Sequence, residues 1–320
     1  MEIRANYGGL IKGVSARIHE IFDEAADVLS IAVPGFVNQK KSEQAQYNAS
    51  GLSPAGKLVK RPEGEAYPVN RRYKTFNTNY IHTTYSGKLE VSMEMLDDRD
   101  FEGVFSETKH LGISARRWGQ QAAFQPLING FTTNAAVNGF DITLYGDGVP
   151  MFSTLHPRAD GGATQSNASS TGIALTETNL EVGRIALVKQ LLDDGSPLAL
   201  LGPIWLAVPT DLEKTAKIIT DSPLRSETSD NDINFYTGGV VNVVASQYLT
   251  ATHGGSATAW YLLAQGLSHV TLVDRKVPTL WDQISAEGGL DVHVDSRLSV
   301  GHSHWLGSWA SKGDLGAYAS

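Results

Sequence analysis

The sequence predicts an α/β or α+β fold. Two long segments near the N-terminus, 8–31 and 101–129, carry apolar residues at three- and four-residue steps, as amphipathic helices do. Short apolar segments separated by turn residues follow toward the C-terminus, and they alternate with further helical segments. Apolar residues make up 41% of the 320 residues, which is enough to bury a sizeable core. Helices packed on sheets are therefore expected.

The first predicted helix, 8–31, has an apolar stripe on one face and charged residues on the other, and Pro34-Gly35 ends it. The stripe consists of Ile11, Val14, Ile18, Ile21, Phe22, Ala25, Val28 and Leu29. An apolar face of this length must be buried. It either packs on the rest of its own chain or docks on a neighbouring subunit.

Two neighbouring segments of opposite charge follow. Segment 38–88 is polar and carries a balance of +6, whereas segment 90–107 carries −6. The basic residues singled out are Lys57, Lys60, Arg61, Arg71, Arg72 and Lys74, and the acidic ones are Glu94, Asp97, Asp98, Asp100 and Glu102. A long extended loop with little apolar content needs a partner surface to hold it. A solvated loop and a nucleic-acid contact are the competing interpretations of the basic cluster.

The second predicted helix, 101–129, contains Gly112 and Gly119, which each cost about 1 kcal/mol of helix propensity. Tertiary packing must therefore hold it, and Pro126 should kink or end it. Turn signals dominate from 130 to 176. The segments expected beyond them are helices at 180–192 and 211–220, strands at 204–208, 240–245, 260–264 and 270–273, and a strand-like tail at 290–310.

Composition excludes several classes of protein. The net charge is −8, and the second half of the chain carries −7 of it, so avid binding of nucleic acid is not expected. The absence of cysteine excludes disulfides and thiolate metal sites. No apolar run is long enough to span a membrane, and the N-terminus lacks the pattern of a signal peptide.

The residues that most resemble catalytic chemistry are histidines of the tail. His293, His302 and His304 lie near Asp291 and Asp295, and a His-x-His pair on a strand would place both rings on one face. Polar residues at a strand end produce the same pattern, and this structural interpretation is favoured. His156 with Asp160 suggests an acid/base pair, but a glycine-rich loop holds such groups poorly. No catalytic, cofactor or metal site is predicted.

The most informative stretch is 146–220. It contains an Asp-Gly turn, a Phe-Ser-x-x-His-Pro element, an Asp-x-Gly turn and a Val-Pro-x-x-Leu helix start. The residues concerned are Asp147, Gly148, Phe152, Ser153, His156, Pro157, Asp193, Gly195, Pro203, Val208, Pro209 and Leu212. This stretch resembles the major head (capsid) proteins of tailed phages, especially the Mu-type head subunit group.

The resemblance implies the Hong Kong 97 type capsid fold, whose parts would follow one another along the chain. They are an N-terminal arm at 1–50, an extended two-stranded loop at 51–92, a peripheral domain with a long spine helix at 93–180 and 276–320, and an axial domain at 181–275. The implied function is a major capsid protein that self-assembles into the icosahedral head of a tailed phage or prophage. Hexamers and pentamers would enclose double-stranded DNA without sequence-specific binding.

The resemblance also implies partners and a location. The protein would be made and assembled in the host cytoplasm and reside in the virion, with a portal as partner. Because no long, highly charged helical segment precedes the first helix, a separate scaffolding protein is expected. Two alternatives stay open: an encapsulin-like compartment that holds cargo, and a metal-dependent hydrolase that uses His293, His302 and His304.

Overall fold

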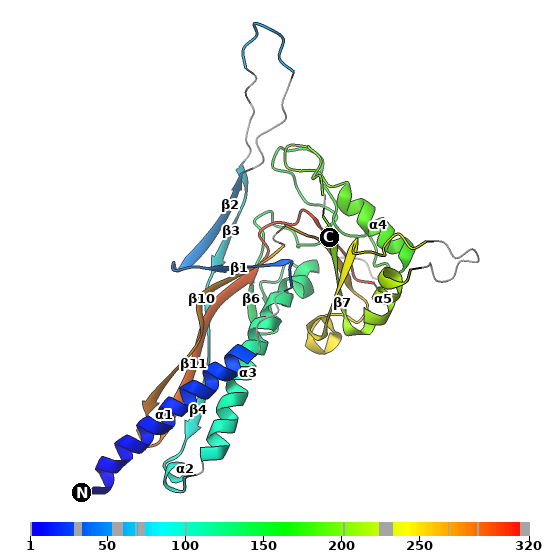
Figure 1. The fold of residues 1–320 in the computed structure, drawn as a ribbon. Helices are drawn as coiled ribbons and strands as arrows, with labels where there is room; N and C mark the ends of the chain where they lie inside the picture. The colour runs from blue at the N-terminus through cyan, green and yellow to red at the C-terminus, as the bar shows by residue number, and fades with distance from the viewer. Residues whose placement is uncertain are drawn as a thin grey trace.

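The computed structural model describes residues 2–28, 34–52, 60–67, 69, 74–99, 101–200, 202–223, 233–267, 269–286 and 288–313. An elongated half contains two long helices that run beside long strands, and a more rounded half contains α4, α5 and β7 (Figure 1). Helices and sheets share both halves, so the predicted α+β class is confirmed.

The longest sheet has six strands in the described part of the chain, and its centre is the antiparallel pair β10 and β11. β11 also pairs antiparallel with β4 and parallel with β6. The six strands are β1 (Val37–Lys41), β4 (Thr83–Val91), β5 (Ala136–Val137), β6 (Phe140–Thr143), β10 (Val270–Ile284) and β11 (Leu290–Gly301). The sheet of the elongated half is therefore built from strands of the N-terminal and the C-terminal parts of the sequence.

β10 is much longer than the strand predicted at 270–273. The charged run after Val273 and the proline at position 278 both argue against a continuing strand. The ladder to β11 accommodates them with two register shifts, one between Asp274 and Lys276 and the other between Lys276 and Thr279. A proline cannot donate to a ladder, and a bulge provides a position that needs no donor.

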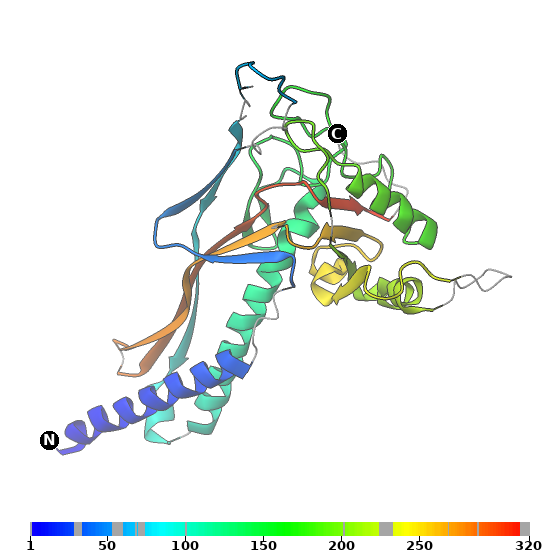
Figure 2. The ribbon, with the colours of Figure 1, turned by 45° about the horizontal axis from the view of Figure 1, so that its top comes forward.

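The helix α1 (Glu2–Val28) packs on α3 (Phe101–Ile128) of the same chain. Of its predicted stripe, Ile11, Val14, Ile18, Phe22 and Ala25 are buried. His19 of α1 also contacts the carboxylate of Asp282 on β10 at 3.0 Å. Figure 2 shows the two helices crossing beside the long strands. The apolar stripe of α1 therefore packs on the rest of its own chain, which is the first of the two interpretations given above.

The helix α3 continues past Pro126 for two residues and then passes into the 3-10 turn Asn129–Phe131. Pro126 is buried in its last turn, so the proline lies near the end of the helix, as the sequence predicts. A short helix, α2 (Met93–Asp97), precedes α3, and the Ser92 hydroxyl caps it by accepting from the amide of Met95 at 3.2 Å.

The strands β2 (Gln46–Leu52) and β3 (Lys74–Ile81) form an antiparallel ladder of their own. This hairpin projects from the molecule at the end opposite α2 (Figure 1). Residues 60–67 lie beyond the ladder, at the far tip of the projection. The structure thus contains a projecting two-stranded loop.

The rounded half is built on a four-stranded sheet with the order β12-β9-β7-β8. The strands are β7 (Ile204–Pro209), β8 (Val241–Ser246), β9 (Trp260–Ala264) and β12 (Ser308–Ser311). Side chains alternate between its two faces. On β7, Ile204, Leu206 and Val208 join one core cluster, whereas Ala207 joins another.

Two helices cover the first of these faces. They are α4 (Glu177–Val188), capped by the Thr176 side chain, and α5 (Glu213–Asp221). α4 contacts β12 and β9, and α5 contacts β8 and β7. Leu180 and Leu187 of α4 and Ala216 of α5 belong to one buried cluster. The helices therefore lie over opposite flanks of one sheet face.

The predicted domain limits do not follow the sheets everywhere. β2 begins inside the predicted arm, and β4 lies in the long sheet although 51–92 was assigned to the loop. β12 pairs with β9, although 276–320 was assigned with the long sheet. The functional names of the domains stay predictions. A tail that returns to a different sheet leaves no local signal in the sequence.

Candidate functional site

The charged residues singled out in the sequence occupy two ends of the molecule. Lys60, Arg61 and Lys74 are exposed on the projecting loop, and Glu94, Asp97, Asp98 and Glu102 are exposed at α2 and the start of α3. Lys57, Arg71, Arg72 and Asp100 lie outside the described residues. β3 and β4 separate the two groups, and their combined extended length is roughly 55 Å. The described members of the two groups therefore do not meet within one chain.

The tip of the projecting loop carries a local arrangement around Arg61. Its guanidinium lies 4.2 Å from the centre of the Tyr67 ring, and its Nη1 donates to the carbonyl of Glu65 at 2.7 Å. Tyr67 is 81% exposed. The loop thus presents a cation and an aromatic ring together, a combination that suits a protein surface as a partner.

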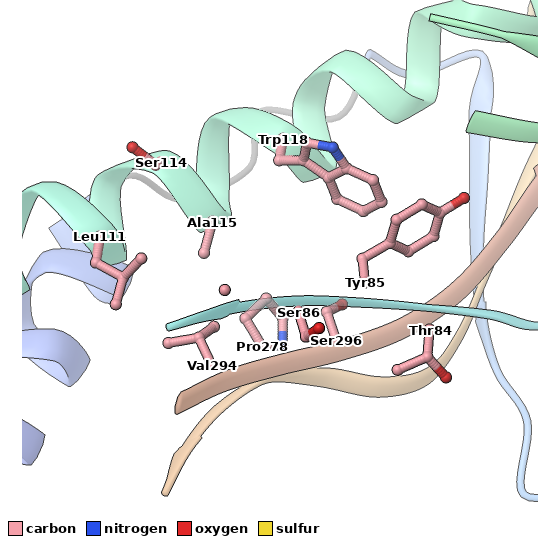
Figure 3. Close-up of a pocket in the computed structure, with 11 residues that line it drawn as sticks. Thr84, Tyr85, Ser86, Leu111, Ser114, Ala115, Trp118, Pro278, Val294 and Ser296 are labelled. Atoms are coloured by element: carbon pink, nitrogen blue, oxygen red, sulfur yellow. The ribbon is translucent and has the colours of Figure 1, made fainter. Parts of the chain in front are cut away.

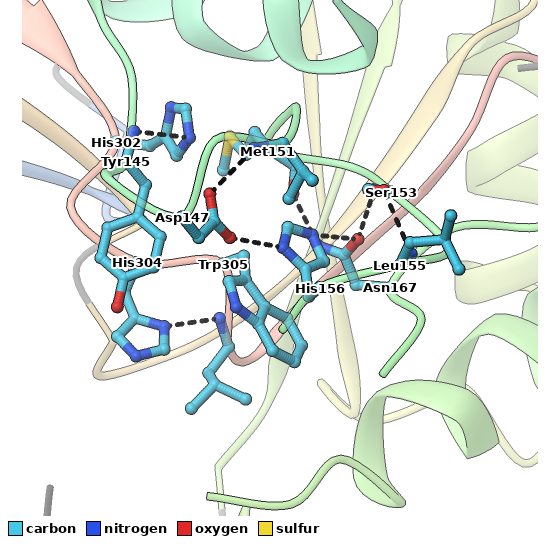
Figure 4. A network of polar contacts seen from close by, with 12 residues as sticks. Tyr145, Asp147, Met151, Ser153, Leu155, His156, Asn167, His302, His304 and Trp305 are labelled. Carbon is cyan, nitrogen blue, oxygen red and sulfur yellow. Dashed lines mark hydrogen bonds and ion pairs between the residues drawn. The ribbon is translucent and has the colours of Figure 1, made fainter. Parts of the chain in front are cut away.

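The stretch with the Asp-Gly turn and the Phe-Ser-x-x-His-Pro element builds a buried polar network instead of a catalytic site (Figure 4). His156 Nδ1 lies 2.8 Å from a carboxylate oxygen of Asp147, and the two side chains are 1% and 0% exposed. The imidazole stacks on Trp305 with ring centres 4.3 Å apart. Asp160 pairs with Arg158 and not with His156, so the acid/base pair that the sequence analysis disfavoured is not formed.

The hydrogen-bond partners of His156 show which of its ring nitrogens carry hydrogens. The Asn167 Nδ2 amide donates to the Met151 carbonyl at 2.7 Å, so its Oδ1 is the acceptor for His156 Nε2 at 3.1 Å. Nε2 therefore carries a hydrogen, and a second hydrogen lies between Nδ1 and Asp147. The pair is buried and shut away from any substrate. Its role is to hold the loop that contains Asp147 and His156 in place, not to transfer protons.

His302 and His304 lie in the loop after β11, not on a strand as the His-x-His pattern suggested. The amide of Tyr145 donates to His302 Nε2 at 3.3 Å, and the amide of Leu306 donates to His304 Nδ1 at 3.0 Å. Burial, together with smaller effects of nearby His156 and His304, lowers the pKa of His302 to about 3. Burial also lowers the pKa of His304. Both rings are packing elements of the core.

The tail does not assemble a metal centre in the described residues. No group of three histidine, cysteine or acidic side chains there is placed to hold an ion. His293 stacks on Trp281 with ring centres 4.1 Å apart, near the other end of β11 from His302. The intervening strand places them roughly 30 Å apart. The three histidines of the hydrolase alternative are therefore not brought together.

A largely apolar groove with a volume of about 430 Å³ lies beneath α3 (Figure 3). Trp118 and Ala115 of α3 face Tyr85 of β4 and Pro278 of β10 across it. Its lining contains no acid, histidine, lysine or arginine. Burial raises the pKa of the Tyr85 hydroxyl, so that group stays neutral. The groove offers no acid/base chemistry.

Three residues of the buried network were missed from the sequence. Asn167 lies in a Ser/Asn/Thr-rich spacer that reads as an ordinary loop. Tyr145 lies two residues before Asp147 but outside the motif, and Trp305 is distant from His156 along the chain. Asn167 connects the loop to the four-stranded sheet, because its Nδ2 also lies 3.2 Å from the hydroxyl of Ser308 on β12. Only the density of polar and aromatic residues around 145–167 hinted at a network.

The described helices contain none that is long and apolar enough to cross a bilayer. A sequence model of the family described as phage capsid protein matches residues 77–301. No curated protein matches the chain significantly.

Solved structures share the fold at low sequence identity. That of Mycobacterium phage Patience has a TM-score of 0.56 at 14% identity and covers 98% of this chain and 89% of that chain. The capsid of the native GTA particle has a TM-score of 0.55 at 11% identity, with 91% and 90% covered. The procapsid of bacteriophage JBD30 has a TM-score of 0.50 at 14% identity, with 96% and 76% covered.

The family match spans more than half of the sequence, and the fold of the whole described chain agrees with it. The chain therefore belongs to the phage capsid protein family and has the Hong Kong 97-like fold. It is a major capsid protein, the subunit from which a phage head shell is built.

Proposed function

We propose that this chain forms hexamers and pentamers that close into a head around double-stranded DNA, with the help of a scaffolding protein and a portal. The observation that carries the proposal is the projecting hairpin, whose basic residues lie at the opposite end of the subunit from the acidic α2 region. Opposite charges at opposite ends of one subunit favour contact between subunits.

In this proposal the loop of one subunit lies over α2 and the start of α3 of the next. Exposed ion pairs contribute less than about 1 kcal/mol each, so no single pair would hold the shell. Repetition by symmetry makes such weak contacts effective, because each subunit engages several neighbours at once. The same weakness permits errors in assembly to be reversed.

The electrostatic balance supports a container for DNA. Because the chain carries a net charge of −8, the inner surface of the proposed shell would enclose the genome without binding it tightly. Assembly would take place in the host cytoplasm, and the finished protein would reside in the virion capsid. Nothing in the described residues favours the encapsulin-like alternative over this one, because no groove there carries a mark of cargo recognition.

The proposed docking is tested by charge reversal. Arg71→Glu with Arg72→Glu, or Lys60→Glu with Arg61→Glu, should prevent shell assembly while the melting temperature of the subunit stays unchanged. Glu94→Lys with Asp97→Lys should do the same, and combining a loop variant with this acidic-site variant should restore particles in electron micrographs. Lys12→Glu, on the exposed face of α1, is the control. Normal shells from the loop variants would refute the docking.

A further inference from the structure

The strand β8 lies at the open edge of the four-stranded sheet in the rounded half. The sheet order is β12-β9-β7-β8, so β8 is paired on one side only within the described residues. The strand at the other end, β12, is covered, because Ala310 bridges Ala168 and the Ser311 hydroxyl accepts from the amide of Ile173 at 2.8 Å. The edge of β8 has no such cover among the described elements, since its main contacts are β7, α5 and the turn Thr210–Leu212.

The ladder between β7 and β8 decides which backbone groups of β8 point outward. The strands are parallel with Ile204 opposite Val241, and the amide of Ile204 donates to the carbonyl of Val240 at 3.0 Å. In a parallel ladder, alternate residues of a strand direct both backbone groups to the same neighbour. Asn242 and every second residue after it therefore bond to β7. The residues whose N–H and C=O groups point outward are Val241, Val243 and Ala245, and these groups have no backbone partner in the part of the chain that the structure describes.

This edge lacks the features that usually protect a strand edge from pairing, which are charged side chains, prolines and bulges. The longer free edges among the other described strands each have one. β1 ends in two lysines, β2 has a register shift after Ser50, β3 begins with Lys74, β4 carries Lys88 and Glu90, and β10 has two register shifts around Pro278. β8 has the sequence VNVVAS, without charge or proline, and its central residues are only half-buried. It is therefore an edge that is open to pairing.

We propose that this edge pairs with β8 of a second copy of the chain, antiparallel and about a two-fold axis at Val243. The outward groups of Val243 then exchange hydrogen bonds with their counterparts, and Val241 does the same with Ala245 at each end. In that register three kinds of facing pair give roughly six hydrogen bonds. A two-fold contact uses the same patch on both copies, so the patch must complement itself. A strand edge with free donors and acceptors does.

The side chains favour β8 itself as the partner strand over the other free edges of a second copy. Val243 packs with the core on the α5 face of the sheet, and Val244 packs with the core on the other face. Self-pairing sets Val243 against itself and Asn242 against Val244, so it places no charge beside an apolar side chain. Apolar pairs of this kind stabilise antiparallel strands. A lysine-bearing edge such as β1 or β4 would set charges beside valine. The inference concerns the free subunit and does not depend on the proposed shell.

A substitution at the centre of the edge tests the pairing. Val243→Pro removes an outward N–H and leaves the ladder to β7 intact, so the melting temperature should stay unchanged. In sedimentation velocity the unassembled protein should form dimers, and this variant should dimerise about thirty-fold more weakly, because the two central hydrogen bonds are lost. Val244→Pro is the matched control, since its N–H bonds to β7 and its loss should lower the melting temperature. An unassembled protein that stays monomeric at high concentration, or dimers that Val243→Pro does not weaken, would overturn the inference.

Cysteine cross-linking gives an independent measurement of the register, because the chain contains no cysteine. Asn242 would face Val244 of the partner subunit in a pair without hydrogen bonds, where side chains come closest. Asn242→Cys with Val244→Cys should therefore give covalent dimers, and no larger species, under mild oxidation. Each single variant lacks a facing thiol and should not cross-link. Cross-linking by a single variant, or a ladder of larger oligomers, would contradict the pairing. Neither test depends on particle formation, so failure here leaves the proposed function standing.

Discussion

Gly112 of α3 lies directly beneath the backbone carbonyl of Phe22 on α1. A Cβ atom built on Gly112 would stand 3.1 Å from that oxygen and 3.1 Å from the Cβ of Ala25. The glycine that weakens α3 as an isolated helix is thus the point at which α1 can cross it closely. The position of α1 on the long half of the molecule depends on this approach.

A branched side chain at this crossing should separate the helices. Gly112→Val should lower the free energy of unfolding by about 2 kcal/mol, because a packed interface has no space for the added atoms. Gly13→Ala is the matched control, since Gly13 is exposed on α1 with no atom within 4 Å of its built Cβ. It should stabilise the helix by up to about 1 kcal/mol. Urea unfolding measures both, and equal stability of the two variants would contradict the close crossing.

The buried pair of Asp147 and His156 should show strong energetic coupling. His156→Ala leaves a carboxylate buried without its partner and should cost about 3 kcal/mol of stability. Adding Asp147→Asn removes that charge, so the double variant should recover part of the loss, with a coupling energy of about 1–3 kcal/mol. The exposed pair of Lys217 and Glu213 should couple by less than about 0.5 kcal/mol in the same cycle. Equal coupling in both pairs would refute the fastening role.

Stability should fall in mild acid because two buried histidines stay neutral in the folded chain. The pKa of His302 is lowered to about 3 and that of His269 to about 4, in both cases mainly by burial. The unfolded chain takes up protons below pH about 6.5, whereas the folded chain does not. Each histidine therefore removes about 1.4 kcal/mol per pH unit as the pH falls from about 6.5 toward its folded pKa.

His302→Gln isolates one of these contributions, because the glutamine oxygen can still accept from the amide of Tyr145. Its free energy of unfolding should depend less steeply on pH between 6 and 4 than that of the unsubstituted protein, by about 1.4 kcal/mol per pH unit. His293→Gln, on the strand surface, leaves both buried rings in place and should keep the original slope. An unchanged slope in His302→Gln would contradict the neutral buried state.

Periodicity predicted the helices well, because their apolar faces are local features. The stripe of α1 and the span of α3 follow directly from it. It failed where distant segments meet. The length of β10 depends on bulges around Pro278, and the pairing of β12 with β9 joins segments far apart in the sequence.

The buried network shows the same division between local and distant information. Asp147 and His156 were recognisable from a motif, because both lie in one stretch of chain. Asn167 and Trp305 become their neighbours only when the loop folds onto the sheets. The assignment of a structural role to His302 and His304 could be argued from their apolar surroundings, but their packing partners could not.

The contents of assembled particles should distinguish a phage head from a cargo compartment. Particles purified from infected or induced cells should contain DNA that resists added nuclease and has no sequence selected by the shell. The control is the same preparation opened with denaturant before nuclease treatment, in which the DNA should be degraded. Particles that instead hold a single protein species and no protected DNA would favour the encapsulin-like alternative.

The most direct test of the account is negative-stain electron microscopy of the purified, over-expressed protein, alone and with its scaffolding protein. A major capsid protein should give closed shells, tubes, or rings of five and six subunits. Small, dispersed particles under both conditions would contradict self-assembly into a head, whatever the fold of the subunit.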